Sequence, residues 1–246
     1  MWAFATLGPA SLPPVSEPLT YQLENKVAVI TMDDGKANAL SAAMIDALLA
    51  ALDRAEAEAS AVVLAGRPER FCAGFDLRVM MSSPAAATAL LKQGSTLLMR
   101  LYGLPLPLVI AATGHAMAGG ALVVLTGDYR VGAAGAYKIG LNEVAIGLPV
   151  PVLAMELARD RLHPTELVHA TLEARIYDPE GALAAGYLDA VVPADELAAR
   201  AMAEATRLGG LARHAYKATK QRLRGRTITY INDTAEEDMR TLLAPQ

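Results

Sequence analysis

The sequence has little of the residue types that carry disulfide, redox or nucleic-acid chemistry. Its 246 residues include one cysteine, Cys72, and aromatic residues make up 5% of the chain. A single cysteine excludes a disulfide within the chain, disfavours a cysteine-based metal cluster and fits a reducing compartment. The low aromatic content disfavours a base-stacking surface. The net charge of −4 comes with no basic stripe, so we expect no nucleic-acid partner.

Targeting signals and membrane-spanning segments are also lacking. No basic residue precedes Lys26, so we expect neither a secretory signal nor a transit peptide. The longest apolar stretch, residues 104–118, is interrupted by two prolines, a glycine and a histidine, and is too short for a membrane span. The four histidines show no metal-ligand spacing. We therefore predict a cytoplasmic protein without a membrane or metal partner.

Short apolar or β-branched runs alternate with helical patterns over the first 190 residues. This alternation predicts an α/β fold with right-handed parallel crossovers. Ser41 is the expected N-cap of the first helix. The expected strands are residues 26–33, 61–66, 107–114, 128–134, 136–140 and 188–192. The expected helices are residues 40–59, 85–104, 119–127, 152–162, 165–174 and 179–186, followed by helical patterns at 194–225 and 234–244.

The composition suggests three parts. Residues 1–19 are rich in proline and are expected to form an extended lead-in, and residues 20–193 form the core. Residues 194–246 are purely helical in pattern and rich in Ala, Glu, Arg and Lys. A helical tail after an α/β core predicts a small lobe that packs on the core or on a neighbouring subunit.

Two corners that contain glycine follow the buried strands. The first is "RFCAGFDL" at residues 70–77, and the second is "GHAMAGG" at residues 114–120. Each leads from a strand into a helix, where backbone N–H groups are unpaired and the helix dipole is positive. Two such corners on adjacent strands could direct two N–H groups at one oxygen, forming an oxyanion hole. The alternative is that these glycines only permit tight turns.

Glu143, in "IGLNEVAIGLP", is the carboxylate best suited to act beside such a hole. Its apolar neighbours predict a pKa raised by desolvation, which suits proton transfer near neutral pH. The alternative is a half-exposed glutamate bonded to a turn. We interpret Asp76 as a helix cap, Asp128 as a junction residue with Arg130 nearby, and His115 as a turn or core residue.

The ordered motifs "GKANALS", "RFCAGFDL", "GHAMAGGALVVLTGDYRV", "IGLNEVAIGLP" and "DPEGALAAGYLDAVVPADEL" resemble the crotonase (enoyl-CoA hydratase/isomerase) superfamily over about residues 20–245. The resemblance implies a crotonase (ClpP-like) fold of stacked ββα turns with a C-terminal helical lobe. It also implies a homotrimer or a dimer of trimers, and a coenzyme A thioester as substrate, with no tightly bound cofactor.

The resemblance also assigns roles. It implies that the backbone N–H groups of Phe75 and Gly119 form the oxyanion hole and that Glu143 is catalytic. The residues it places beside the coenzyme A thioester are Lys36, Ala37, Ala73, Asp76, Leu77 and Leu122. Lys217 or Lys220 could reach a coenzyme A phosphate.

Position 122 departs from the hydratase pattern. Hydratases of this family carry a second glutamate there, whereas this chain has Leu122. A single carboxylate facing an apolar wall suits proton shuttling with water excluded. The segments "AGGALVVLTGDYR" and "IGLNE" are most similar to the Δ3,Δ2-enoyl-CoA isomerase branch. Another reaction on a coenzyme A thioester, and an acyl-CoA binder without turnover, stay open as alternatives.

Overall fold

The computed structural model describes residues 17–242. Most of the predicted proline-rich lead-in (residues 1–16) and residues 243–246 lie outside the described part. The division of the chain into three parts stays a prediction. Within the described residues, no helix is both long and apolar enough to cross a bilayer.

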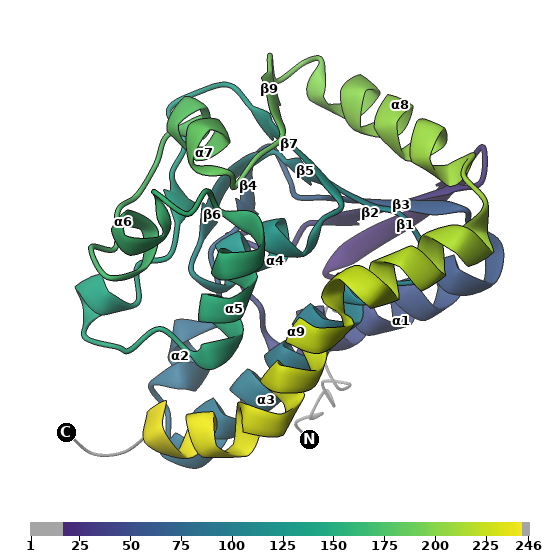
Figure 1. Cartoon of the computed structure of the whole chain (residues 1–246). Coiled ribbons are helices and arrows are strands. Elements are labelled where there is room, and N and C mark those ends of the chain that lie inside the picture. The colour runs from purple at the N-terminus through teal and green to yellow at the C-terminus, as the bar shows by residue number, and fades with distance from the viewer. Residues whose placement is uncertain (1–16, 243–246) are drawn as a thin grey trace, which may run out of the picture.

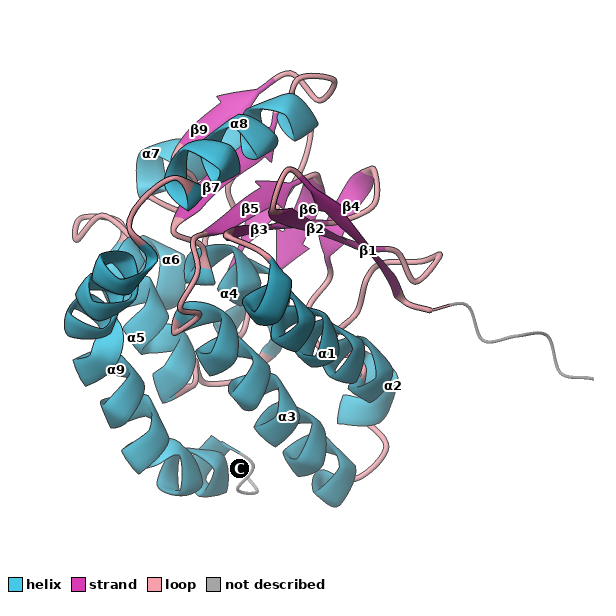
Figure 2. Cartoon of the chain, turned by 90° about the vertical axis from the view of Figure 1, so that its right-hand side faces the viewer, coloured by secondary structure: helices cyan, strands magenta, loops and turns pink. Residues whose placement is uncertain are grey.

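Two sheets organise this part of the chain (Figures 1 and 2). The main sheet has the order β1-β2-β3-β5-β7-β9, in which β1 runs antiparallel to β2 and all other neighbours are parallel. Its strands are β1 (Leu19–Glu24), β2 (Val27–Met32), β3 (Ala61–Ala65), β5 (Leu108–Ala112), β7 (Tyr129–Ala133) and β9 (Ala190–Val192). A smaller parallel sheet contains, in order, β4 (Glu69–Cys72), β6 (Gly114–Met117) and β8 (Ile139–Gly140).

Successive strands alternate between the two sheets. β3 leads to β4, β5 leads to β6, and β7 leads to β8, with helices between these pairs. The chain therefore repeats a ββα unit, and the α/β fold predicted from the sequence is confirmed. β1, β4 and β6 are not among the predicted strands. For β1, the alternation of Leu19, Tyr21 and Leu23 is the only local signal.

The helices are distributed unequally over the main sheet. Figure 2 shows α8 on one side and the bundle of α1, α3, α4, α5 and α9 on the other. The helices are α1 (Ala42–Glu58), α2 (Leu77–Met80), α3 (Pro84–Tyr102), α4 (Gly119–Thr126), α5 (Val152–Arg161), α6 (Leu167–Thr171), α7 (Pro179–Ala185), α8 (Leu197–Gly209) and α9 (Arg213–Leu242), together with the 3-10 helix η1 (Val144–Ile146).

The side chains of the central strands point alternately to the two faces of the main sheet, and this divides the core into two clusters. Val62 and Leu64 of β3 pack with the helical bundle, whereas Val63 of the same strand packs with α8. Successive side chains of a strand point to opposite faces, and both faces are covered here. This explains why the apolar runs that predict β3 and β5 are uninterrupted.

Most predicted helices are present, and two regions differ. Ser41 caps α1 by accepting a hydrogen bond from the Met44 N–H at 3.2 Å, as expected. Only Leu167–Thr171 of the predicted helix at 165–174 is α-helical. In the C-terminal region the predicted helix at 194–225 is interrupted, because α8 ends at Gly209 and α9 begins at Arg213. α9 then continues to Leu242, so residues 226–233, which were not predicted to be helical, are part of it. Burial of Ile231 against the core offsets the weak helix propensity of that segment.

Candidate active site

The first corner lies between β4 and α2. Leu40 donates its N–H to the Gly74 carbonyl at 2.8 Å and accepts from the Asp76 N–H at 3.3 Å. Leu40 and Phe75 form a parallel bridge, in which the N–H and the carbonyl of Leu40 bond to the residues on either side of Phe75. The Phe75 N–H therefore points to the side away from Leu40.

Asn38 fixes this corner, and sequence reasoning did not single it out. Its side chain is fully buried, and its amide donates to the carbonyls of Met32, at 3.0 Å, and Arg70, at 2.9 Å. Its backbone has φ +52, a region that asparagine tolerates better than most residues. An asparagine between two alanines in the "KANAL" segment is the signal that could have identified it.

The second corner lies between β6 and α4. Ala118 has φ +48 and ψ −120, an unusual conformation for a residue with a Cβ, and its side chain provides no cap for α4. Its N–H donates to the Gly140 carbonyl at 3.0 Å, which ties the corner to β8. Gly119 is the first residue of α4, so its N–H has no acceptor within the helix.

The two corners are in direct contact. A Cβ built on Gly74 would lie 3.0 Å from the Met117 carbonyl oxygen and 3.2 Å from the Gly119 nitrogen. A Cβ on Gly120 would overlap the Cys72 carbonyl oxygen. These glycines therefore allow two backbones to touch, beyond permitting turns.

The Phe75 ring fills the space between α3 and α4. It occupies the position that a Cβ on Gly94 would take, and it would lie 3.1 Å from a Cβ on Gly119. In the described part of the chain, no turn, loop or cap hydrogen bond has the Phe75 or Gly119 N–H as its donor. Two donors from adjoining corners are thus available to an external acceptor.

Glu143 is tied to the second corner along the chain, through the pairing of β6 with β8. Met117 pairs with Gly140, and Glu143 follows three residues later, immediately before η1. Its side chain is 9% exposed, and its Oε2 atom is buried without a hydrogen-bond partner. Burial raises the pKa of Glu143 above its ordinary value of 4.5, against a smaller opposing effect of backbone hydrogen bonds. The desolvation predicted from the apolar sequence context is therefore present.

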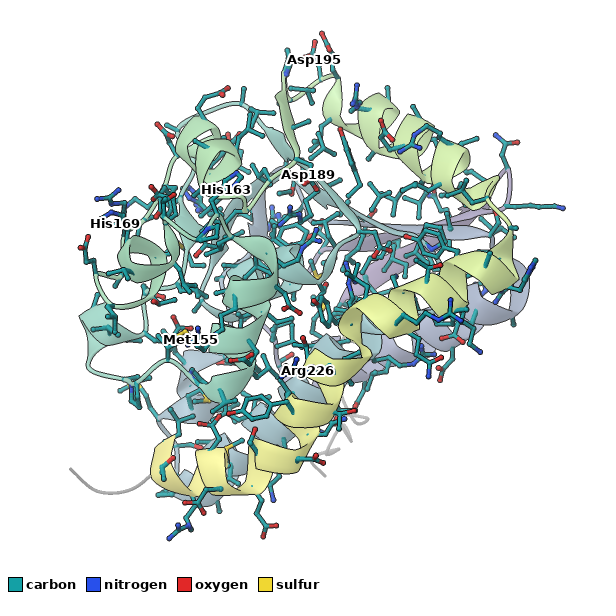
Figure 3. All side chains as sticks on the ribbon, in the orientation of Figure 1. Met155, His163, His169, Asp189, Asp195 and Arg226 are labelled. Atoms are coloured by element: carbon teal, nitrogen blue, oxygen red, sulfur yellow. The ribbon has the colours of Figure 1, made fainter. Side chains whose placement is uncertain are left out.

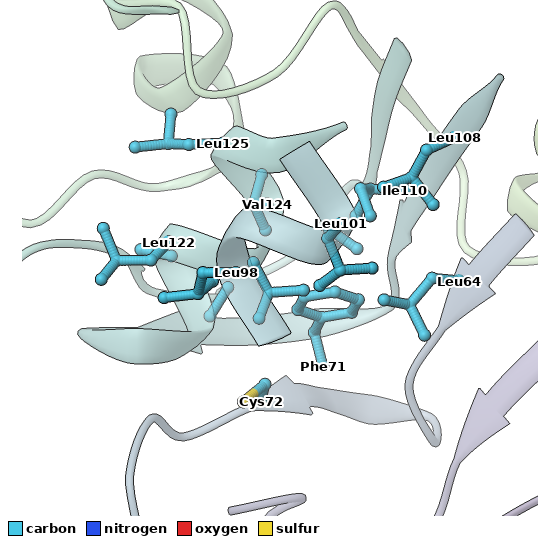
Figure 4. Close-up of a cluster of buried hydrophobic side chains, with 14 of the residues drawn as sticks. Leu64, Phe71, Cys72, Leu98, Leu101, Leu108, Ile110, Leu122, Val124 and Leu125 are labelled. Atoms are coloured by element: carbon cyan, nitrogen blue, oxygen red, sulfur yellow. The ribbon is translucent and has the colours of Figure 1, made fainter. Parts of the chain in front are cut away.

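Leu122 lies one turn into α4, a helix whose residues are all buried. Figure 4 shows Leu122 and Val124 of α4 in one layer with Leu98 and Leu101 of α3. Leu122 also shares with Phe75 the lining of a cavity of about 60 Å³. The wall beside the first corner is therefore apolar.

The other predicted binding residues lie on two adjoining segments. The Ala73 N–H donates to the Ala37 carbonyl at 3.0 Å, so the segments around them run side by side. Lys36, Ala73 and Leu77 are exposed, and Ala37 is half-buried.

Asp76, on the same pair of segments, acts as the predicted cap. It accepts from the Arg78 N–H at 2.9 Å. Although burial opposes the change, hydrogen bonds from Arg78 lower the pKa of Asp76.

The suggestion that Lys220 reaches a coenzyme A phosphate is wrong. Its ammonium is 6% exposed and lies 2.6 Å from Asp128, and it also donates to the carbonyls of Leu104 and Leu106. Burial lowers the pKa of Lys220 to about 8. Lys220 thus joins α9 to the core, whereas Lys217 is exposed.

The charged partners near Asp128 also differ from the expected ones. Asp128 pairs with Lys220 and with Arg224, the latter at 3.0 Å. Arg130 pairs with Asp189 at 2.7 Å. Lys220 and Arg224 lie about ninety residues from Asp128 in the sequence, so no local pattern could predict that they pair with it.

Cys72 and the histidines provide no further reactive centre. Burial raises the pKa of the Cys72 thiol to about 12, which keeps it protonated. The His115 Nδ1 atom accepts from the Lys138 N–H at 3.0 Å. His115 lies within strand β6 and is half-buried, so its interpretation as a turn or core residue is wrong. His163 and His169 lie in separate positions in Figure 3. Within residues 17–242, no group of three or more His, Cys, Asp or Glu side chains is arranged to hold a metal ion.

With this geometry in place, comparisons with known proteins identify the class. The family model for enoyl-CoA hydratase/isomerase matches residues 22–242. The chain therefore belongs to the enoyl-CoA hydratase/isomerase family, and the resemblance to the crotonase superfamily is confirmed.

Individual relatives include proteins described as isomerases and as hydratases. The chain is 30% identical over 223 residues to human enoyl-CoA delta isomerase 1, mitochondrial, covering 89% of this chain and 74% of that protein. A solved enoyl-CoA hydratase/isomerase family protein from Pseudomonas syringae is 42% identical, with a TM-score of 0.90 and coverage of 93% and 99%. A Mycobacterium tuberculosis protein is 40% identical, with a TM-score of 0.84 and coverage of 93% and 96%. It has been described both as an enoyl-CoA isomerase and as a probable enoyl-CoA hydratase.

Proposed function

We propose that the protein shifts the double bond of a 3-enoyl-CoA to the 2 position. The thioester carbonyl oxygen accepts hydrogen bonds from the Phe75 and Gly119 N–H groups, which stabilise the negative charge that develops when C2 loses a proton. Glu143 removes that proton, and a dienolate forms. Glu143 then returns the proton at C4 to give the 2-enoyl-CoA.

The observation that carries this proposal is the combination of a desolvated carboxylate, one oxygen of which has no hydrogen-bond partner, with an apolar residue at position 122. The buried Oε2 atom of Glu143 has a raised affinity for a proton, as a reversible proton carrier requires. Leu122 is 4% exposed and offers no group that could hold a water molecule for hydration. The similarity to proteins described as isomerases also supports this reaction.

The coenzyme A moiety is assigned to the two adjoining segments around Ala37 and Ala73. Lys36 is exposed there, so its ammonium is available to a phosphate group, whereas the Arg67 guanidinium donates to the Lys36 carbonyl at 3.2 Å and pairs with Asp33 at 3.6 Å. Coenzyme A enters as part of the substrate, and we propose that no other cofactor is needed. Assembly into a homotrimer or a dimer of trimers is likewise a prediction, which light scattering would test.

The test compares Glu143→Gln with the unaltered protein on 3-hexenoyl-CoA. Formation of the conjugated enoyl thioester is followed by its ultraviolet absorbance. Loss of the proton carrier should lower kcat by about 10²- to 10⁴-fold, the usual range for general acid–base catalysis. Glu180→Gln, which removes an exposed carboxylate of α7, is the matched control. Turnover by Glu143→Gln equal to that of the control would contradict the assignment.

A hydratase is the second candidate, because some relatives are described as hydratases. Assaying crotonyl-CoA for loss of its conjugated absorbance separates the two reactions. Hydration faster than isomerisation of 3-hexenoyl-CoA would favour the hydratase. Tight acyl-CoA binding with no product from either substrate would favour a binding protein without turnover.

A further inference from the structure

The cavity beside Phe75 and Leu122 is built from four helices of this chain. Apart from Ser95 and Asp238, its lining is apolar. The lining includes Phe75, Leu91 and Leu122 and, from the C-terminal part of the chain, Ala235 and Asp238. The lining residues come from the first corner, α3, α4, the start of α5, and the last third of α9.

The α9 residues of this wall form one helical face. Ile231, Ala235, Asp238 and Leu242 follow one another at intervals of three or four residues, and Met239 lies four residues after Ala235, which aligns them along the helix. α9 packs against α5 and α3, and it forms one wall of the cavity. The position of α9 therefore sets the size of the cavity.

Asp238 holds α9 in that position. α5 begins after Pro151, whose side chain cannot accept a hydrogen bond, so α5 lacks a local N-cap. The Asp238 carboxylate, 86 residues further along the chain, accepts from the Val152 N–H at 2.8 Å. Burial raises the pKa of Asp238, so this carboxylate is kept in an apolar wall at a cost. We call the Asp238–Val152 hydrogen bond the α5–α9 clasp.

We propose that the α5–α9 clasp, by fixing one wall of this cavity, limits the length of the acyl chain that the protein accepts. The inference rests on the proposed function only for the position of the thioester carbonyl at the Phe75 and Gly119 N–H groups. Because Phe75 lines both the carbonyl site and the cavity, an acyl chain leaving that carbonyl along the apolar wall of Leu122 enters the cavity.

The size of the cavity gives the expected preference. A water molecule occupies about 30 Å³ in the liquid, so about 60 Å³ admits only a few chain atoms. Each methylene group that is buried should tighten binding about fourfold, until the cavity is full. Beyond that length, α9 must move away from α5 and the gain per methylene should end.

The experiment measures binding of saturated acyl-CoA esters from butanoyl-CoA to dodecanoyl-CoA by calorimetry. Saturated esters cannot isomerise, so binding is read independently of turnover. In the unaltered protein, affinity should rise with chain length and then level off at a short chain. Asp238→Ala and Leu91→Ala should both move the plateau to longer chains, the first by releasing the clasp and the second by enlarging the cavity from α3. Ala235→Phe should move it to shorter chains by filling the space.

Two controls separate the clasp from a loss of folding. Asp238→Asn keeps an oxygen that can accept from the Val152 N–H, so it should retain the original plateau. Glu236→Ala alters an exposed residue of the same helix and should change nothing. Should Asp238→Ala fail to fold, Leu91→Ala and Ala235→Phe still test the cavity.

Unchanged plateaus in Leu91→Ala and Ala235→Phe would overturn the cavity assignment, and an unchanged plateau in a folded Asp238→Ala would overturn the role of the clasp. Shifted plateaus in a protein that isomerises no 3-enoyl-CoA would uphold this inference and reject the proposed function. Isomerisation of 3-enoyl-CoA with unchanged plateaus would uphold the proposed function and reject this inference.

Discussion

Replacing Gly74 by alanine tests directly whether the backbone at the two corners is the catalytic group. Gly74 has φ +95, and its added Cβ would lie 3.0 Å from the Met117 carbonyl oxygen and 3.2 Å from the Gly119 nitrogen. Both neighbours are backbone atoms of the second corner, so relief of the contact requires one corner to move. Such a movement changes the separation of the Phe75 and Gly119 N–H groups without altering any reactive side chain.

The substitution should lower both the stability and the activity of the protein. A residue with a Cβ in the left-handed region costs about 1–2 kcal/mol, and overpacking at a rigid contact costs about 1–3 kcal/mol. Misplacing one oxyanion donor typically lowers kcat by about 10²- to 10³-fold. Gly74→Ala should therefore be moderately less stable and lose at least about 100-fold in isomerisation of 3-hexenoyl-CoA.

Gly186→Ala is a matched control. Gly186 has φ +93, and its added Cβ would lie 2.9 Å from the Arg161 carbonyl oxygen and 3.2 Å from the His163 nitrogen. It should lose similar stability in thermal unfolding but keep most of its turnover per folded molecule. Equal turnover in the two variants, both measured well below their melting temperatures, would refute the idea that the contact between the corners positions the oxyanion donors.

Three further predictions concern the carboxylates. Because burial raises the pKa of Glu143 and the base must be ionised, kcat/KM should fall as the pH drops through a value above 4.5, and an acid limb at or below 4.5 would contradict this. Glu143→Gln should be more stable than the unaltered protein at pH 7 by about 1–3 kcal/mol in urea unfolding, because it removes a buried charge of which one oxygen has no hydrogen-bond partner. Since the folded-state pKa exceeds the unfolded one, that advantage should shrink as the pH falls towards 4.5, and a constant difference would argue against it. Asp128→Asn should cost about 3–5 kcal/mol in the same assay, because Lys220 and Arg224 would remain buried without a counter-charge, and a loss below 1 kcal/mol would refute that role.

Local sequence signals predicted the elements whose burial is uniform. The apolar runs of β3 and β5 and the fully buried α4 need only their own composition to be recognised, and Ser41 acts within its own turn. β1 was missed because an edge strand with one buried residue has little apolar content. The continuity of α9 was missed because tertiary burial of Ile231 decides it.

The features of the candidate site were likewise predictable where the signal is local and not where it depends on distant residues. The raised pKa of Glu143 was predictable from its apolar neighbours, since desolvation by adjacent residues is a local effect. The pairing of Lys220 with Asp128, and the capping of α5 by Asp238, join residues 86 or more positions apart. No periodicity or spacing in the sequence encodes such contacts, so only the fold could assign Lys220 to the core instead of to a phosphate.

The strained backbone positions give a last argument about why the site depends on the core. Asn38, Gly74, Ala118 and Gly140 all have positive φ, and each belongs to a segment that meets at the two corners. Conformations of this kind persist only when the surrounding structure over-determines them. Here these conformations are fixed by three sets of hydrogen bonds: those of the Asn38 amide, those of Leu40 to the first corner, and the Ala118–Gly140 bond. The bonds connect both sheets to the corners. If the main-chain donors are the catalytic groups, mutations that loosen these supports should lower turnover before they lower the melting temperature, although none of them touches the substrate.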